Sequence, residues 1–285
     1  MPNLYIVAGP NGAGKSTYVR DYLLQEVCCR EFVNADVIAA ELAPGAPENA
    51  AVAAGRVTLR RLQELAASGK DFSFETTLSG RTYFPLLTNF RERGYRIRLD
   101  FLWVPELGLT QRRVQQRVLK GGHDIPAHVQ ERRFHLGVRN LVTLYRPVLD
   151  WWRIYDNSGG TPLLLVEEKD GVLKIMDRER LDLVERTSNA RFMAEGPVDR
   201  VEEPAGLLPW TDETRGSMRA MRRAYARVVL ENKSFGLPVI QWRQGRGVVE
   251  VPAEQLEPLA RRILEVNGEP LPEAEERALL AHVKV

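Results

Sequence analysis

The chain has 285 residues, of which 44% are hydrophobic and 27% are charged, an ordinary composition for a globular protein of one large or two smaller domains. Its 40 Lys and Arg residues nearly balance 38 Asp and Glu residues, which leaves a net charge of +2 with His neutral. This balance argues against a protein whose main task is to coat nucleic acid or an anionic membrane.

The two cysteines, Cys28 and Cys29, are adjacent, and neighbouring residues rarely meet the geometry of a disulfide. Their scarcity favours a reducing, cytoplasmic location. Residues 1–3 carry no basic stretch before an apolar run, so no signal peptide is expected. No apolar run approaches the ~18 residues that a membrane-spanning helix requires.

Short apolar runs alternate with helical patterns along most of the chain. Strands are predicted at residues 4–8, 31–33, 71–75, 96–104 and 152–155, and helices at residues 50–67, 84–93, 110–120, 127–145 and 178–185. Asp170-Gly171 predicts a β-hairpin of residues 163–166 and 172–175. Strands that alternate with helices indicate an α/β fold with a mainly parallel sheet flanked by helices.

The region after residue 193 differs in composition. Residues 194–210 are rich in Gly and Pro without a clear period, which predicts a linker. The tail, residues 211–285, is expected to be a small α+β unit with helices at residues 218–231 and 252–264 and a hairpin of residues 238–242 and 247–251. The predicted division is therefore a domain of residues 1–193, a linker of residues 194–210 and the tail.

Residues 9–16 read Gly-Pro-Asn-Gly-Ala-Gly-Lys-Ser, which fits the P-loop pattern between a buried-type strand and a helix. Backbone N–H groups of such a loop surround phosphate oxygens, and the helix adds its positive N-terminal end. Lys15 is expected to reach the β- and γ-phosphates, and the Ser16 hydroxyl to bind Mg²⁺. The predicted nucleotide-binding residues are Gly9, Pro10, Asn11, Gly12, Ala13, Gly14, Lys15, Ser16 and Thr17.

A P-loop alone does not name a reaction, because GTPases, transporters, motors and kinases all use one. The sequence shows no clear Walker-B strand, since Asp100 lies in mid-strand, and no guanine-specificity motif. The short, compact early strands favour a small-molecule kinase. Asp36 follows the second strand, at the edge that lines the ligand crevice. There it would accept the proton of an attacking hydroxyl, or else cap the helix that begins at Val37.

Glu75 and Thr77 follow the third predicted strand. A carboxylate and a hydroxyl at a strand end suit the hydroxyl groups of a sugar or ribose, or a water molecule on Mg²⁺. The alternative is that Thr77 or Ser79 caps a helix.

A hinged lid is predicted at residues 121–126, Gly-Gly-His-Asp-Ile-Pro, between two helices. The basic residues around it are Arg112, Arg113, Arg117, Lys120, Arg132 and Arg133. Arginines on such a lid neutralise charge on the transferred phosphoryl group, and closure excludes water. The alternative is a solvated basic helix face. The nearby histidines match no zinc spacing with Cys, so no structural metal is expected.

In combination these elements resemble the zeta-toxin family of P-loop kinases. The residues that carry the resemblance are the P-loop at residues 9–17, Asn34-Ala35-Asp36, Phe74-Glu75-Thr76-Thr77-Leu78, Arg117 with the Gly-Gly-His-Asp-Ile-Pro turn, Arg132-Arg133 and Tyr155-Asp156-Asn157-Ser158. They span roughly residues 2–186. The resemblance implies ATP- and Mg²⁺-dependent phosphorylation of a nucleotide-sugar hydroxyl, usually that of UDP-N-acetylglucosamine, whose product poisons cell-wall synthesis.

The resemblance also implies roles for single residues. Asp36 would be the general base, Lys15 the phosphate ligand and Ser16 the magnesium ligand. Glu75, Thr77 and Arg81 would contact the acceptor. Arg117, with Arg132 or Arg133, would stabilise the charge on the transferred phosphoryl group. The family pattern Glu-x-Thr-x-Arg is altered here, because Ser79 occupies the last position and Arg81 lies two residues further on. NAD, which a related effector branch modifies, is therefore an alternative acceptor.

Other functions stay open at this point. The chain could phosphorylate a nucleoside or a polynucleotide end, or bind ATP as a regulatory protein without catalysis. The tail lies outside the kinase resemblance and looks like small proteins encoded beside zeta-like kinases. We expect it to be an antitoxin-like segment that restrains the kinase in cis, or an accessory or oligomerisation domain. The expected partner is a small-molecule acceptor rather than nucleic acid or a membrane.

Overall fold

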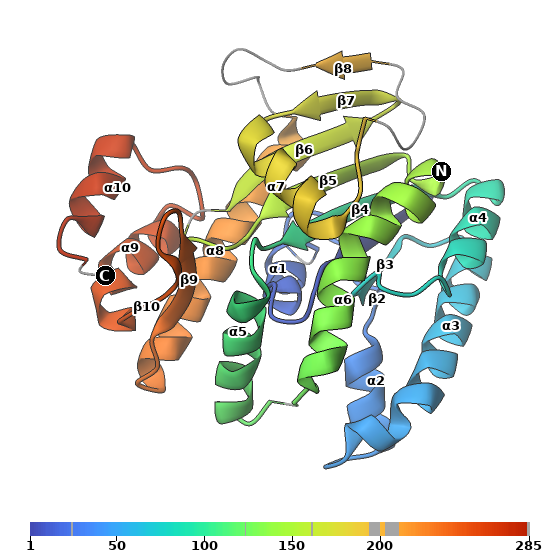
Figure 1. The fold of residues 1–285 in the computed structure, drawn as a ribbon. Helices are drawn as coiled ribbons and strands as arrows, with labels where there is room; N and C mark the ends of the chain where they lie inside the picture. Colours follow the sequence, from blue (N-terminus) through green and yellow to red (C-terminus); the bar gives the residue numbers. More distant parts are fainter. Residues whose placement is uncertain (24, 123, 161, 194–199, 203–210, 284–285) are drawn as a thin grey trace.

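The computed structural model describes residues 1–23, 25–122, 124–160, 162–193, 200–202 and 211–283 and is built around an eight-stranded sheet (Figure 1). Its strands are β1 (Asn3–Ala8), β2 (Phe32–Val33), β3 (Phe72–Thr76), β4 (Arg96–Trp103), β5 (Trp151–Asp156), β6 (Leu163–Lys169), β7 (Val172–Ile175) and β8 (Arg200–Glu202). They lie in the order β2-β3-β1-β4-β5-β6-β7-β8. Strands β2, β3, β1, β4 and β5 are mutually parallel, whereas β6 runs antiparallel to β5 and to β7. The predicted α/β fold with a mainly parallel sheet is confirmed.

Helices cover both faces of this sheet (Figure 1). They are α1 (Lys15–Tyr22), α2 (Ala35–Leu42), α3 (Ala51–Ala67), α4 (Phe84–Glu92), α5 (Leu107–Leu119), α6 (Ala127–Asn140), α7 (Arg178–Ser188), α8 (Asp212–Ser234), α9 (Ala253–Glu265) and α10 (Glu273–Leu280). Successive side chains of a strand point to opposite faces. Leu4 and Ile6 of β1 therefore pack in one core cluster with α3, α4 and α7, while Tyr5 and Val7 pack in a second cluster with α1 and α8.

The hairpin predicted around Asp170 and Gly171 is present. Both residues have positive φ angles, 51° and 78°, as a tight two-residue hairpin turn requires. The helix predicted at residues 127–145 is α-helical only as far as Asn140 and continues as a π-helical turn to Tyr145. Within the predicted linker, residues 200–202 form β8 beside β7, and the other residues of that segment lie outside the described part of the chain.

The tail contains helices α8, α9 and α10 and the antiparallel hairpin of β9 (Val239–Arg243) and β10 (Gly247–Val251). The first half of α8 packs with α1 through Met218 and Met221, and its second half packs with α9 through Tyr225 and Val229. One continuous helix thus belongs to both the P-loop core and the core of the tail. Helix α10, which the sequence patterns did not predict, contributes no buried residue.

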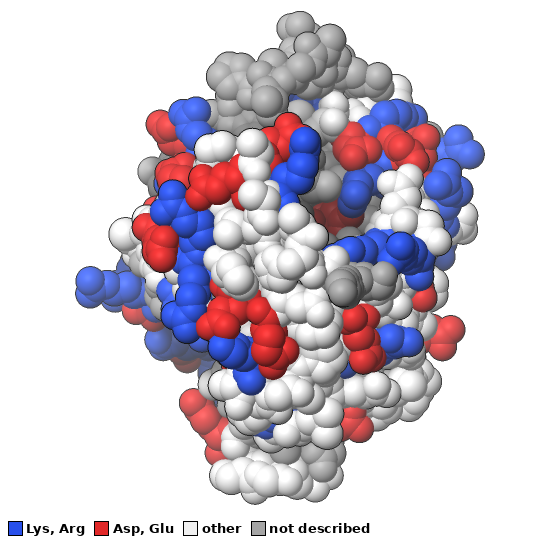
Figure 2. All heavy atoms as spheres, turned by 90° about the vertical axis from the view of Figure 1, so that its left-hand side faces the viewer, with Lys and Arg blue, Asp and Glu red and all other residues white. Residues whose placement is uncertain are grey.

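On the face of the molecule that carries the tail, the described residues present interspersed positive and negative side chains and form no large region of one sign (Figure 2). No helix in the described part of the chain is both long and apolar enough to cross a membrane. Cys28 is exposed, Cys29 is buried, and both are free thiols.

Candidate active site

The P-loop connects β1 to α1 and contains three glycines with positive φ angles: 143° at Gly9, 79° at Gly12 and 92° at Gly14. A Cβ atom at Gly9 would lie 2.4 Å from the Leu102 carbonyl oxygen, and one at Gly12 would lie 2.6 Å from the Thr110 carbonyl oxygen. Because only glycine adopts these conformations without strain and allows such close backbone contact, the loop packs directly on the end of β4 and on α5.

Glu75, at the end of β3, contacts the first residues of α1. The Ser16 hydroxyl donates to Glu75 Oε2 at 2.9 Å, and Asn34 Nδ2 donates to the same oxygen at 3.3 Å. Lys15 Nζ lies 3.8 Å from Glu75 Oε1 and donates to the Pro10 carbonyl oxygen at 2.9 Å. The carboxylate therefore lies beside Lys15 and Ser16, the two P-loop side chains that the sequence predicts to bind phosphate and Mg²⁺.

The side-chain oxygens of Ser16 and Glu75 fit Mg²⁺. This ion takes oxygen ligands, is commonly held by one or two protein side chains, and completes its shell with substrate phosphates and water. Within the described residues, no group of three or more His, Cys, Asp or Glu side chains is arranged to hold a metal ion. A magnesium ion at this site would therefore depend on the phosphates of a bound nucleotide for its remaining ligands.

Asp36 lies in the first turn of α2, and its side chain is exposed and lines the cavity above the P-loop. The cap of α2 is Asn34, whose Oδ1 accepts from the backbone N–H groups of Asp36 at 2.8 Å and of Val37 at 3.4 Å. Asn34 therefore caps α2, and the Asp36 side chain takes no part in the cap.

Four charged side chains surround Lys15. Burial lowers the pKa of the Lys15 ammonium. The carboxylates of Glu75 and Asp36 raise this pKa, whereas the guanidinium groups of Arg117 and Arg133 lower it further. Burial also lowers the pKa of Arg133, and Asp36 opposes that shift as well. The structure therefore brings the predicted base, the P-loop lysine and two of the predicted arginines into one electrostatic cluster.

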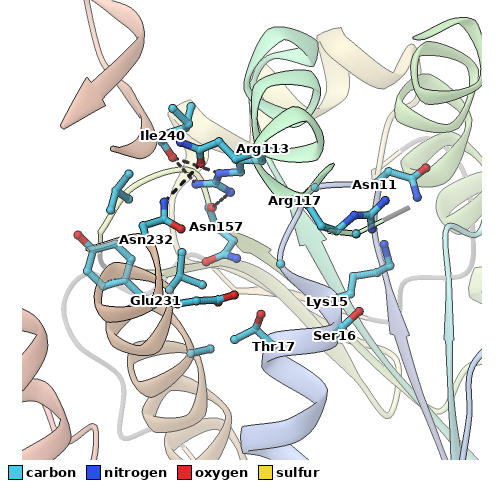
Figure 3. A pocket seen from close by; sticks show the side chains of 18 of the residues that line it. Asn11, Lys15, Ser16, Thr17, Arg113, Arg117, Asn157, Glu231, Asn232 and Ile240 are labelled. Atoms are coloured by element: carbon cyan, nitrogen blue, oxygen red, sulfur yellow. Dashed lines mark hydrogen bonds between the residues drawn. The ribbon is translucent and has the colours of Figure 1, made fainter. Parts of the chain in front are cut away.

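The two arginines of this cluster come from the helices on either side of the lid turn. Arg117 extends from α5 to the cavity, on the same side as Lys15 and Ser16 (Figure 3). Arg133, on α6, donates from Nη1 to Asn11 Oδ1 at 3.1 Å. Its neighbour Arg132 is exposed and does not line the cavity. His123, in the lid turn, lies outside the described residues.

Thr77 and Arg81 lie apart from this cavity. The Thr77 hydroxyl shares a hydrogen bond of 2.9 Å with that of Ser79, and α4 begins only at Phe84, so neither hydroxyl caps a helix. Arg81 is exposed in the turn before α4. The acceptor-binding roles of Thr77 and Arg81 stay predictions.

Two residues have positions that the motifs did not reveal. Asn157, directly after β5, donates from Nδ2 to the Ala13 carbonyl oxygen at 2.8 Å and so supports the P-loop. Arg113, expected on the lid as a cation for phosphate, instead donates to the carbonyl oxygens of Ile240, Asn157 and Ser158. Burial lowers the pKa of Arg113 to about 10. Asn157 belongs to the Tyr155-Asp156-Asn157-Ser158 motif of the resemblance and follows a strand, whereas no sequence pattern indicated the partners of Arg113.

We expect Gly12→Ala to weaken nucleotide binding by about tenfold or more, because a residue with a Cβ atom costs about 1–2 kcal/mol in this conformation and would also contact the Thr110 carbonyl oxygen. Titration calorimetry with a non-hydrolysable ATP analogue measures the loss. The control is Gly55→Ala in α3, where an added Cβ atom meets nothing within 4 Å. Equal affinity of the two variants would contradict a P-loop that grips phosphate in this conformation.

A family model described as an AAA domain matches residues 4–140. An uncharacterized protein of Haemophilus influenzae is 28% identical over 126 residues, which make up 44% of this chain and 88% of that protein. One chain of the AvrRxo1-ORF1:AvrRxo1-ORF2 complex, solved with sulphate ions, is 16% identical to this chain. The match covers 80% of this chain and 76% of that chain, with a TM-score of 0.53. With ATP bound, the same complex gives a TM-score of 0.51 at 16% identity and the same coverage.

A chain of the PezAT toxin–antitoxin system of Streptococcus pneumoniae is 15% identical over 80% of this chain and 88% of the other, with a TM-score of 0.48. At such identities a likeness extends to the fold and not to the substrate. The matched segment contains the P-loop, Asp36, Glu75, Arg117 and Arg133. The sheet order and the AvrRxo1 likeness show an α/β fold, in which residues 9–16 form the P-loop between β1 and α1.

Proposed function

We propose that this chain is an ATP- and Mg²⁺-dependent kinase that phosphorylates a hydroxyl group of a nucleotide-linked sugar, with UDP-N-acetylglucosamine as the first candidate. The observation that carries the proposal is the cavity above the P-loop, which Lys15, Asp36, Glu75 and Arg117 line, with Arg133 hydrogen-bonded to Asn11 of the loop. A P-loop that only senses a nucleotide needs no carboxylate opposite the γ-phosphate position. Phosphoryl transfer needs that carboxylate together with positive charge.

The proposed reaction assigns each group one task. The acceptor hydroxyl oxygen forms a bond to the γ-phosphorus, the bond from that phosphorus to the β–γ bridging oxygen breaks, and ADP leaves. Asp36 accepts the proton of the hydroxyl. Lys15 and Arg117 stabilise the charge on the transferred group, while Glu75 with Ser16 provides oxygen ligands suited to Mg²⁺.

Two observations bear on the acceptor. Asp36, on α2, and Arg133, on α6, interact electrostatically, and we propose that the acceptor hydroxyl lies between these two side chains. Ser79 replaces the arginine of the family pattern and bonds to Thr77. NAD, which offers ribose hydroxyls to the same base, is therefore the second candidate.

The test is transfer of the labelled γ-phosphoryl group from ATP to a panel of UDP-sugars, NAD, nucleosides and oligonucleotide ends. We expect a phosphorylated UDP-sugar, identified by mass spectrometry, whose formation requires Mg²⁺ and stops when a chelator removes it. Transfer only to another acceptor would contradict the sugar assignment. ATP binding without any transfer would contradict the kinase proposal itself.

The sequence left two roles open for the tail, an antitoxin-like restraint of the kinase and an accessory or oligomerisation domain. A restraint predicts that substitutions which disturb the tail next to the P-loop raise the rate of transfer. The cavity between the P-loop and the tail gives reason to consider a different role.

A further inference from the structure

The cavity above the P-loop has two walls that belong to distant parts of the chain. It has a volume of about 390 Å³, within the range of small-molecule sites. One wall is the P-loop with α5. The other consists of tail residues from α8 and β9, namely Ala224, Tyr225, Val228, Glu231, Asn232, Val239 and Ile240. Figure 3 shows Glu231, Asn232 and Ile240 on one side and Lys15, Ser16 and Arg117 on the other.

The two sides differ in chemistry. The P-loop side presents Lys15, Arg117 and the N-terminus of α1, all of which attract anions. The tail side is mainly apolar, with Val228, Ile240 and the aliphatic and aromatic surface around them. A molecule with a highly charged end and a flat apolar end is complementary to these two walls. A nucleoside triphosphate is such a molecule, because its phosphates are charged and its base is flat and apolar.

The tail wall is fixed to the core by buried polar contacts. Ser217 of α8 shares a hydrogen bond of 2.6 Å with the Tyr18 hydroxyl of α1 and donates to Tyr155 of β5 at 2.9 Å. Further along α8, Arg223 donates to Glu26 at 2.9 Å. Because buried polar groups that lose their partners are costly, α8 does not leave this position as a detachable inhibitor would.

The tail also holds the helix that carries Arg117. Arg113 Nε donates to the Ile240 carbonyl oxygen at 3.1 Å, and Gln116 Nε2 donates to that of Pro238 at 2.6 Å. Lys120, one residue beyond α5, lies 3.5 Å from Glu231 of α8. The tail thus supports both helices that border the phosphate site, α1 and α5.

From these contacts we propose that the tail forms the base-binding wall of the donor nucleotide pocket. The triphosphate lies on the P-loop, and the base and ribose lie against Val228 and Ile240, with the Glu231 carboxylate as acceptor for their N–H and O–H groups. The inference depends on one element of the proposed function, namely that the P-loop binds a nucleoside triphosphate. If so, the tail is part of the donor site.

The first test is binding of ATP and of inorganic tripolyphosphate, measured by titration calorimetry. Val228→Trp fills the apolar end, and we expect it to weaken ATP binding by about tenfold or more while tripolyphosphate binding stays within about twofold. The control is Ser234→Trp, at the exposed end of α8 and outside the cavity. Unchanged ATP affinity in the folded Val228→Trp variant would overturn the proposal.

Glu231→Leu, which removes both acceptor oxygens, separates the wall from a restraint. A wall that accepts hydrogen bonds from the nucleoside loses ATP affinity on this change, whereas a restraint that repels phosphate gains it. A gain in ATP affinity, or equal changes for ATP and tripolyphosphate, would overturn the base-wall assignment. Neither outcome depends on phosphoryl transfer, so both are distinct from failure of the proposed kinase activity.

A second test uses the unmodified protein and does not depend on the folding of a variant. Irradiation with 8-azidoadenosine triphosphate should attach the label within residues 224–241, and excess ATP should prevent the reaction. Peptide mapping by mass spectrometry locates the adduct. Labelling confined to residues outside α8 and β9 would overturn the proposal.

Discussion

Asp36→Asn is expected to lower kcat by about 10²–10⁴-fold, the usual contribution of a general base. The variant keeps the size of the side chain and leaves the cap of α2 unchanged, because that cap is Asn34. What is lost is the ability to accept the proton of the acceptor hydroxyl. The rate is measured in the transfer assay with the best acceptor of the panel.

Two further measurements make this result specific. ATP binding should stay within about twofold of that of the parent protein, since the substitution alters no P-loop group. The control is Glu41→Gln, an exposed carboxylate near the other end of α2, which should retain the full rate. Near-normal turnover of Asp36→Asn would place the base elsewhere.

Asp100→Asn is expected to lower the free energy of unfolding by about 3–5 kcal/mol. Asp100 binds the Arg153 guanidinium through both carboxylate oxygens, at 2.7 and 2.9 Å, and its Oδ2 accepts from the Tyr18 hydroxyl at 2.6 Å. Arg153 and Asp100 are 4% and 6% exposed, so a neutral partner leaves the buried guanidinium without its counter-charge. Urea unfolding at constant m value measures the loss.

The control is Glu273→Gln, which removes one partner of an exposed ion pair with Arg277 on α10. An exposed pair contributes about 0–1 kcal/mol, so the free energy of unfolding should change little. The double variant Asp100→Leu with Arg153→Leu should recover part of the loss, because it buries no unpaired charge. A loss below about 1 kcal/mol in Asp100→Asn would mean that water reaches Arg153.

The sequence predicted those parts of the fold that local patterns encode. The P-loop glycines, the strand before them and the Asp170-Gly171 turn each depend on neighbouring residues, and each is found as expected. Asn34 and Asp36 show the limit of local patterns. Both residue types cap helices well, and only the coordinates show that Asn34 accepts the backbone hydrogen bonds.

Contacts between distant segments could not be predicted in this way. Arg113 and Arg117 lie four residues apart on α5, and both line the cavity. Arg113 nevertheless donates to carbonyl oxygens of β9 and of the segment after β5, whereas Arg117 interacts electrostatically with Lys15. The difference arises from the tail, whose position against α5 has no signal in a single sequence. The contact between Tyr18 and Ser217 spans 199 positions of the chain and is hidden for the same reason.

That contact has a consequence for the order in which the newly made protein matures. Tyr18 belongs to the helix that follows the P-loop, and its hydroxyl lies in a buried network that Ser217 and Thr214 complete. While the ribosome is still translating the tail, the amino-terminal region has already emerged. The surface of this region that α8 later buries, which contains both apolar and polar side chains, is then still exposed. Because a domain generally folds as a unit and α8 contributes to the buried network of Tyr18, helix α1 reaches its final surroundings only after translation has passed α8.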